Sequence, residues 1–129
     1  MSIKLYWVDE KQTILRYDVR GRWTWWDFYE AFGRAYRMSA TVQHRVDMMV
    51  NLADSGPFPG GALNHAQTLS NRLSENMGLT IVVTGNRLAK ALYQSGCGLY
   101  PNVPAFLRLA NSVEEARALI EAERNQEDA

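Results

Sequence analysis

LTIVVT, at residues 79–84, is a short and almost uninterrupted apolar run that is rich in β-branched side chains. This composition is typical of a strand buried on both faces of a parallel sheet, and such a strand needs helices to cover it. A turn at Gly85 follows, and Leu88 and Leu92 then recur at helical spacing before Gly96, a residue type that commonly ends a helix. The run therefore predicts a strand, a turn and a helix that ends at Gly96, which is the repeating unit of an α/β fold.

A second unit of the same kind follows this helix. FLRL, at residues 106–109, is expected to be the next strand. Ser112 and Glu115 then form a capping box, because the serine hydroxyl can accept the Glu115 amide hydrogen while the Glu115 carboxylate accepts that of Ser112. We therefore expect a helix to begin there, with a buried stripe formed by Ala116, Leu119 and Ile120.

The front of the chain predicts a hairpin and an aromatic helix. Two strand-like runs, at residues 5–8 and 14–19, are separated by a charged loop at residues 9–12. Thr24 and Asp27 make a second capping box, in which aspartate replaces the usual glutamate. The helix that follows should turn one stripe toward the sheet, formed by Trp25, Phe28, Tyr29, Phe32 and Tyr36.

The middle of the chain supplies a third strand and another helix. The strand is expected at residues 46–52, and a loop rich in glycine and proline follows it at residues 53–61. A helix then resumes at Ala62 and ends before Gly78. Its buried stripe is expected to comprise Ala62, Ala66, Leu69 and Leu73.

The predicted order of elements is β-β-α-β-α-β-α-β-α. Strands that alternate with helices call for right-handed β-α crossovers and a largely parallel sheet, with the first hairpin strand antiparallel at or near an edge. We therefore expect a single-domain α/β fold with a mixed, largely parallel sheet of four or five strands. It should span residues 1–124, and the polar residues 125–129 should form a disordered tail.

Composition excludes several classes of partner and site. The 129 residues make one domain that is long enough to bury a core without a disulfide or a metal. Fourteen basic residues balance fourteen acidic ones, so no overall charge draws the chain to nucleic acid or to an anionic membrane. No apolar run approaches the roughly 20 residues that span a bilayer, and we see no secretion signal, so we expect no membrane insertion. The single cysteine, Cys97, excludes an internal disulfide and a multi-cysteine zinc cluster and favours a reducing cytoplasm.

The carboxy-terminal half of the chain carries a resemblance to a known family. A helix that ends in Ser95-Gly96 precedes the strand at residues 106–109, and Ser112 begins a Ser-x-x-Glu-Ala helix start. This order resembles the STAS domain, the fold of anti-sigma-factor antagonists and of sulfate-transporter tails, and the resemblance covers most of the chain. It implies helices mostly on one face of the sheet, a cytoplasmic location and a regulatory role in binding partners, sometimes nucleotides or lipid-like ligands.

The same resemblance makes Ser55 a candidate phosphoacceptor. In antagonist members, a partner kinase phosphorylates a serine or threonine within Asp-Ser-Ser/Thr-Gly, at the start of the helix after the third strand. Asp54-Ser55-Gly56 is similar, although residues 57–61 separate it from the expected helix start. A phosphate there would add about −1.5 to −2 charges and could gain hydrogen bonds at the helix terminus. A plain surface turn is the alternative.

Polar residues follow the strands of the predicted sheet and precede its helices. Loops that follow parallel strands gather at one edge of the sheet, where ligands of open α/β folds usually bind. Helix amino termini there present unpaired amides, so an anionic ligand such as a nucleotide is a candidate, although the glycines also suit ordinary turns. The candidate ligand- or partner-binding residues are Asp54, Ser55, Gly60, Gly61, Asn86 and Arg87.

Two binding functions are compatible with this pattern. The first is a non-enzymatic regulatory module that binds a protein partner or forms a homodimer through the edge at residues 54–61. Trp23 and Trp26 fit the aromatic stripe poorly and are candidates for an exposed interface. The second is a small-ligand carrier or sensor, for an anionic, nucleotide or lipid-like molecule, that uses the same edge or an apolar cleft beside the Trp25 helix.

A catalytic function is the third alternative. Ser55 could act as a nucleophile if His65 lay within hydrogen-bond reach as its base, which would make the protein a hydrolase. No motif predicts a cofactor, and His44 and His65 lie in no metal-binding pattern. The absence of a catalytic signature favours a binding module over an enzyme.

Overall fold

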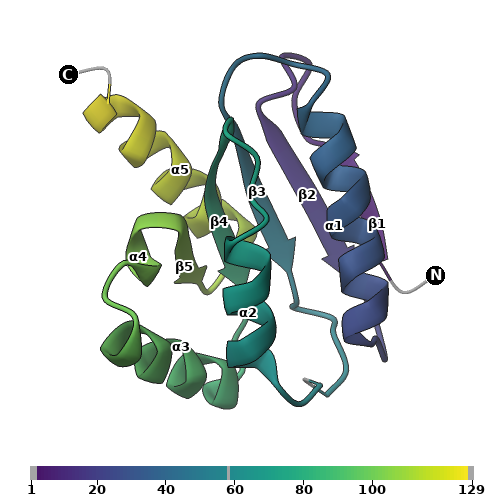
Figure 1. Cartoon of the computed structure of the whole chain (residues 1–129), viewed down its shortest axis with the longest axis vertical. Coiled ribbons are helices and arrows are strands. Elements are labelled where there is room, and N and C mark those ends of the chain that lie inside the picture. Colours follow the sequence, from purple (N-terminus) through teal and green to yellow (C-terminus); the bar gives the residue numbers. More distant parts are fainter. Residues whose placement is uncertain (1–2, 58, 128–129) are drawn as a thin grey trace.

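Five strands form one sheet in the order β1-β2-β3-β4-β5 in the computed structural model, which describes residues 3–57 and 59–127 (Figure 1). The edge strand β1 is antiparallel to β2, and the other neighbouring strands are parallel. The predicted α/β fold with a mixed, largely parallel sheet is therefore confirmed, with five strands. Their bounds are β1 (Ile3–Trp7), β2 (Ile14–Val19), β3 (Val46–Asn51), β4 (Met77–Val83) and β5 (Leu107–Ala110).

Four of the five helices of the described residues begin close to their predicted starts. Their bounds are α1 (Trp25–Ser39), α2 (Ala62–Ser70), α3 (Arg87–Leu99), α4 (Val103–Phe106) and α5 (Val113–Glu127). The capping box before α1 is confirmed, since Asp27 N donates to Thr24 Oγ1 and Thr24 N donates to Asp27 Oδ2. Before α5, Glu115 N donates to Ser112 Oγ as predicted, but the Glu115 carboxylate accepts from the amide of Asn111 instead of that of Ser112.

Several local predictions are wrong. The helix α2 ends at Ser70 and not just before Gly78, and Tyr36, expected in the buried stripe of α1, is 45% exposed. Gly96 does not end α3 but lies buried inside it, and a Cβ at this position would lie 3.2 Å from Leu63 Cδ2 of α2, so the glycine permits close helix packing. The short helix α4 was not predicted and precedes β5. The tail is also shorter than expected, because α5 continues through Asn125–Glu127; residues 128–129 lie outside the described part.

Helices cover both faces of the sheet, but unequally. Figure 1 shows α1 and α2 on one face and α5 on the other. Ala116 and Ile120 of α5 are fully buried and belong to the same core cluster as Ile81 of β4. Phe28 and Phe32 of α1 pack on the opposite face, whereas α2 contributes no fully buried residue there. The predicted buried stripe of α2 is therefore only half-buried.

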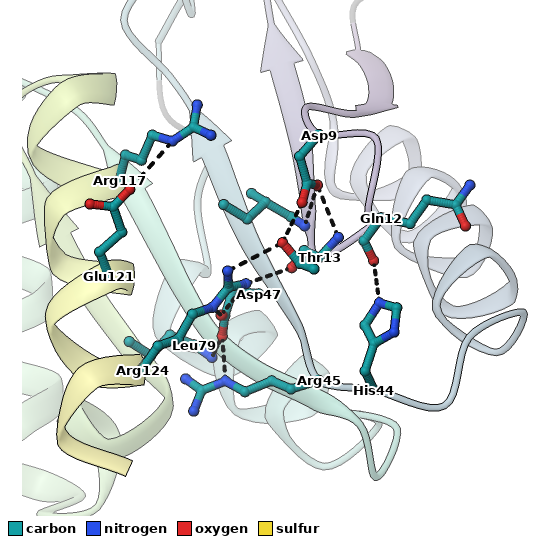
Figure 2. A network of polar contacts seen from close by, with 11 residues as sticks. Asp9, Gln12, Thr13, His44, Arg45, Asp47, Leu79, Arg117, Glu121 and Arg124 are labelled. Carbon is teal, nitrogen blue, oxygen red and sulfur yellow. Dashed lines mark hydrogen bonds and ion pairs between the residues drawn. The ribbon is translucent and has the colours of Figure 1, made fainter. Parts of the chain in front are cut away.

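An ion-pair network closes the amino-terminal edge of the parallel strands (Figure 2). Asp47 of β3 is fully buried and accepts hydrogen bonds from Arg45 Nε at 2.8 Å, from Arg124 Nε of α5 at 2.9 Å and from the amide of Leu79 at 2.8 Å. Arg124 also donates to the backbone oxygen and the hydroxyl of Thr13, at the start of β2. The network therefore ties the last helix to the hairpin and to the centre of the sheet.

Two carboxylates near the hairpin have low pKa values because hydrogen bonds outweigh their burial. Burial raises the pKa of Asp9, but hydrogen bonds from Thr13 and from the Ile14 amide hold it below its ordinary value. Burial likewise raises the pKa of Asp18, but hydrogen bonds from Tyr6, Arg16 and Asn51 and the charge of Arg16 lower it overall. Both carboxylates are therefore paired parts of the scaffold.

Candidate functional site

An apolar cavity of about 160 Å³ lies between α2 and the sheet. We call it the α2 cavity. Its floor is formed by β2 to β5, and its walls by α1, α2, α3 and α4, with side chains such as Trp25, Leu63 and Tyr93. Along β4, Leu79, Ile81 and Val83 point toward α5 and are at most 1% exposed, whereas Thr80 and Val82 point toward the cavity and are only half-buried. The α5 face is therefore filled, and the α2 face is not.

Small side chains opposite one another create this space. Ala62 and Ala66 are the small apolar residues of α2 among those that line the cavity, and the short side chains of Val50, Thr80 and Val82 lie on the floor. Large aromatic side chains stand on both sides and hold the helices apart. These are Trp23, Trp25, Phe28 and Phe32 on one side and Tyr93 and Phe106 on the other.

An aromatic contact joins α1 to α2 beside the cavity. The ring of His65 stacks on Trp25 at a centroid distance of 4.6 Å, and its Nδ1 lies 2.8 Å from the hydroxyl of Tyr29. Trp25 Nε1 donates to the backbone oxygen of Gly60, just before the start of α2. These contacts fix one side of α2 at its amino-terminal end.

The lining of the α2 cavity is uncharged, and its phenols stay protonated. Among the described residues that line it, none is an aspartate, glutamate, lysine, arginine or histidine. Burial raises the pKa of Tyr17 well above its ordinary value. Burial also raises the pKa of Tyr93 to about 12, with a further contribution from its hydrogen bond with Cys97. The cavity therefore suits a neutral ligand, because a charged one would lose hydration without gaining a counter-charge.

The predicted edge residues fall into two groups at the carboxyl ends of β3 and β4, which lie at the same edge because the strands are parallel. Ser55 accepts a hydrogen bond from Trp23 Nε1 at 2.8 Å and donates to the backbone oxygen of Gly56. Asp54 is exposed, and its backbone oxygen accepts from the Gly21 amide. Ser55 therefore anchors the loop to the segment just before α1, and its role as a phosphoacceptor stays a prediction.

The second group caps α3. The side-chain oxygen of Asn86 accepts from the amides of Leu88 and Ala89, while Arg87 is exposed. Gly61 has a left-handed backbone, with φ of 82°, and precedes α2 without a side-chain cap. Among the described residues, no hydrogen bond or ion pair joins the Asn86 group to the Ser55 group. Ser55 and Asn86 thus make hydrogen bonds within the protein, and a ligand at this edge stays a prediction.

The two tryptophans expected at an interface differ in exposure. Trp23 is only 6% exposed, so the prediction that it is exposed is wrong. Its indole nitrogen binds Ser55, and its ring lies 5.0 Å from that of Trp25. Trp26 is 80% exposed. Trp23 therefore belongs to the wall of the cavity, and Trp26 alone of the pair presents its ring to solvent.

The catalytic pairing of Ser55 and His65 has no counterpart in the described part of the chain. Ser55 Oγ is engaged with Trp23 and Gly56, and His65 with Tyr29 and Trp25. No hydrogen bond joins Ser55 to His65 within residues 3–57 and 59–127. Over the same residues, no group of three or more His, Cys, Asp or Glu side chains could hold a metal ion.

The sequence did not identify the main residues of the cavity floor as part of a binding site. Tyr17, Thr80 and Val82 lie in strands whose sequences are typical of an ordinary hydrophobic core. The sequence feature that could have indicated a cavity is the pair of alanines, Ala62 and Ala66, in the stripe of α2 that faces these strands. Small residues there leave volume unfilled unless the helix moves closer to the sheet.

Comparisons of this chain with protein-family models, with curated proteins and with solved structures found no match. Over the described residues, no helix is both long and apolar enough to cross a membrane. A proposal about function therefore rests on the geometry of the site itself.

Proposed function

We propose that this protein is a non-enzymatic module that binds a small, neutral and largely apolar molecule in the α2 cavity. The observation that carries this proposal is the asymmetry of β4. Its side chains toward α5 are completely buried, while those toward α2 border an uncharged space of about 160 Å³. An engineered cavity of about 150 Å³ with an apolar lining is large enough to bind benzene. A ligand of one ring or a short chain therefore fits.

The cost of an empty cavity supports the same proposal. A closed, unfilled cavity costs about 24 cal/mol per Å³, which amounts to about 4 kcal/mol for a closed space of 160 Å³. The α2 cavity is partly open to solvent, so its cost is smaller than this value. A ligand that fills the space regains contacts that the side chains leave unmade. The half-buried stripe of α2 agrees with a helix that rests on a ligand as well as on the sheet.

Benzene is expected to bind saturably in the α2 cavity. In ¹H–¹⁵N NMR titrations, shifts should concentrate on the amides of Val50, Thr80 and Val82, which form the floor. Ala66→Leu should weaken benzene binding at least tenfold because the added side chain occupies the space, and it should raise the free energy of unfolding by about 1 kcal/mol.

Asn64→Leu is the matched control for this variant, since Asn64 lies exposed on α2. It adds a leucine outside the cavity and should leave benzene affinity within about twofold of the wild-type value. Shifts scattered over the surface, or equal affinities for the two variants, would contradict binding in the α2 cavity.

A second candidate function is recognition of a protein partner or of a second copy of this chain. The observation that favours it is Trp26, whose ring is 80% exposed and lies beside that of Tyr29. A large exposed aromatic side chain is typical of residues that become buried in an interface. This function agrees with the regulatory role and cytoplasmic location that the STAS-like resemblance implies, and the resemblance itself stays a prediction.

If Trp26 mediates self-association, Trp26→Ala should shift the protein from dimer to monomer. Light scattering across a range of protein concentrations would measure this shift. Tyr36→Ala is the control, because Tyr36 is also an exposed aromatic residue of α1, at 45%. A wild-type protein that stays monomeric at every concentration would exclude the homodimer and leave only a heterologous partner.

A further inference from the structure

We infer that the ligand of the α2 cavity is a neutral aromatic compound of one ring that carries one hydroxyl group, held by the hydroxyls of Tyr17 and Thr80. This inference rests on the proposed function and adds the chemistry of the ligand. It follows from the polar atoms of a lining that is otherwise apolar.

Most polar side chains of the lining already have partners in the protein. The indole nitrogens of Trp23 and Trp25 donate to Ser55 and to Gly60. The hydroxyls of Ser70 and Tyr93 donate to backbone oxygens of Gln67 and Leu107. These groups are satisfied without a ligand, so none of them calls for one.

Two hydroxyls of the lining remain poorly satisfied. Tyr17 is 1% exposed, and its hydroxyl donates only to the thioether sulfur of Met48, at 3.5 Å. A thioether is a weak acceptor, and a buried hydroxyl without a good partner is costly. Thr80 is half-buried at the cavity floor, and its hydroxyl has no hydrogen-bond partner among the described residues.

The sheet register brings these two hydroxyls to one place. Met48 of β3 is paired directly with Thr80 of β4, so the two side chains stand side by side on the cavity face. Tyr17 of β2 reaches the sulfur of Met48 from the other side. Tyr17 and Thr80 are therefore both neighbours of Met48 on the cavity face, where, among the described residues, theirs are the two hydroxyls without an oxygen or nitrogen partner.

The rest of the lining selects the body of the ligand. Aromatic side chains flank the space on both sides, and aromatic rings pack favourably with one another. The uncharged lining excludes an ionised carboxylate or amine. A phenol hydroxyl, which stays protonated at pH 7 like that of tyrosine, can accept from Tyr17 and donate to Thr80. Both protein hydroxyls would then gain an oxygen partner.

The test compares phenol, benzene and benzoate as probes at pH 7, by NMR titration of the intact chain. Phenol should bind about tenfold more tightly than benzene, and benzoate should bind at least tenfold more weakly than phenol. Thr80→Val and Tyr17→Phe should each weaken phenol binding by about threefold to tenfold while leaving benzene within about twofold. In the double variant, phenol and benzene should bind equally.

Thr68→Val is the matched control for Thr80→Val. The Thr68 hydroxyl donates to the backbone oxygen of Asn64, and its side chain is not part of the cavity lining. It should leave the preference for phenol over benzene unchanged.

The outcomes separate this inference from the function on which it rests. If benzene and phenol both fail to bind, the proposed function and the inference are both overturned. If both bind with equal affinity, or if phenol keeps its advantage in the double variant, ligand binding stands and the role of the two hydroxyls is rejected. If benzoate binds as tightly as phenol, the ligand is not restricted to neutral compounds.

Discussion

Asp47→Ala is expected to lower the free energy of unfolding by about 3–4 kcal/mol, as measured by urea denaturation. Asp47 is fully buried, so its loss leaves two guanidinium groups without their shared carboxylate and the Leu79 amide without an acceptor. Arg45 and Arg124 are 25% and 29% exposed and can regain some hydration, which places the expected effect at the lower end for a buried pair.

Two further variants test the cause of this loss. Asp47→Asn keeps an acceptor for the Leu79 amide and removes only the charge, so it should cost less than Asp47→Ala. Glu121→Ala removes the exposed ion pair with Arg117, and it should cost under about 0.5 kcal/mol. Equal losses for Asp47→Ala and Glu121→Ala would show that the network adds no more than a surface pair.

Val83→Ala is expected to cost about 2–3 kcal/mol, whereas Val82→Ala should cost under about 1 kcal/mol. The two residues are neighbours in β4 and undergo the same chemical change. Val83 is 1% exposed and packs in the cluster that includes Ile120 of α5, while Val82 is half-buried and already borders the α2 cavity. Removing methyl groups from Val83 opens a new void, but removing them from Val82 only enlarges an existing one.

Chemical denaturation of the two variants would measure this difference directly. Saturating benzene should stabilise Val82→Ala at least as much as it stabilises the wild type, because the enlarged cavity still accepts it. If Val82→Ala cost as much as Val83→Ala, the α2 face of the sheet would be packed as tightly as the α5 face. The proposed function would then lose its main support.

Local signals in the sequence predicted the elements well. The β-branched run at residues 79–84 predicted the strand β4, which spans Met77–Val83, and the capping box at Thr24 predicted the start of α1. These signals depend on residues near one another in the chain. The parallel pairing followed from the alternation of strands and helices, which also depends only on the order of elements.

The errors arose at residues whose surroundings are set by contacts with distant parts of the chain. Glycine commonly ends a helix, but Gly96 lies inside α3, where its missing side chain lets Leu63 of α2 approach. Trp23 breaks the helical period, which suggested exposure, yet it is buried and its indole nitrogen donates to Ser55, 32 residues away. Neither the contact of Gly96 with Leu63 nor that of Trp23 with Ser55 can be predicted from spacing, since each joins residues that only the tertiary fold brings together.

The candidate site was predicted only in outline. An apolar cleft beside the Trp25 helix was one of two locations considered for a ligand, and the α2 cavity lies there. Its volume could not be predicted, because it depends on how far the aromatic side chains hold α2 from the sheet. The partly satisfied hydroxyls of Tyr17 and Thr80 depend in turn on the strand register.

The bonds from Arg124 to Asp47 and Thr13 also affect biosynthesis. They connect residues separated by 77 and 111 positions, so they can form only after residue 124 has been translated. Until then, a nascent chain that has already paired β1 to β4 lacks one partner of a buried carboxylate and the helix that covers one side of its sheet. Domains fold as units during synthesis, and exposed apolar surface on such intermediates promotes aggregation. We therefore expect ribosome-bound chains that stop before residue 113 to be protease-sensitive and to recruit chaperones, and release of the full chain to end both.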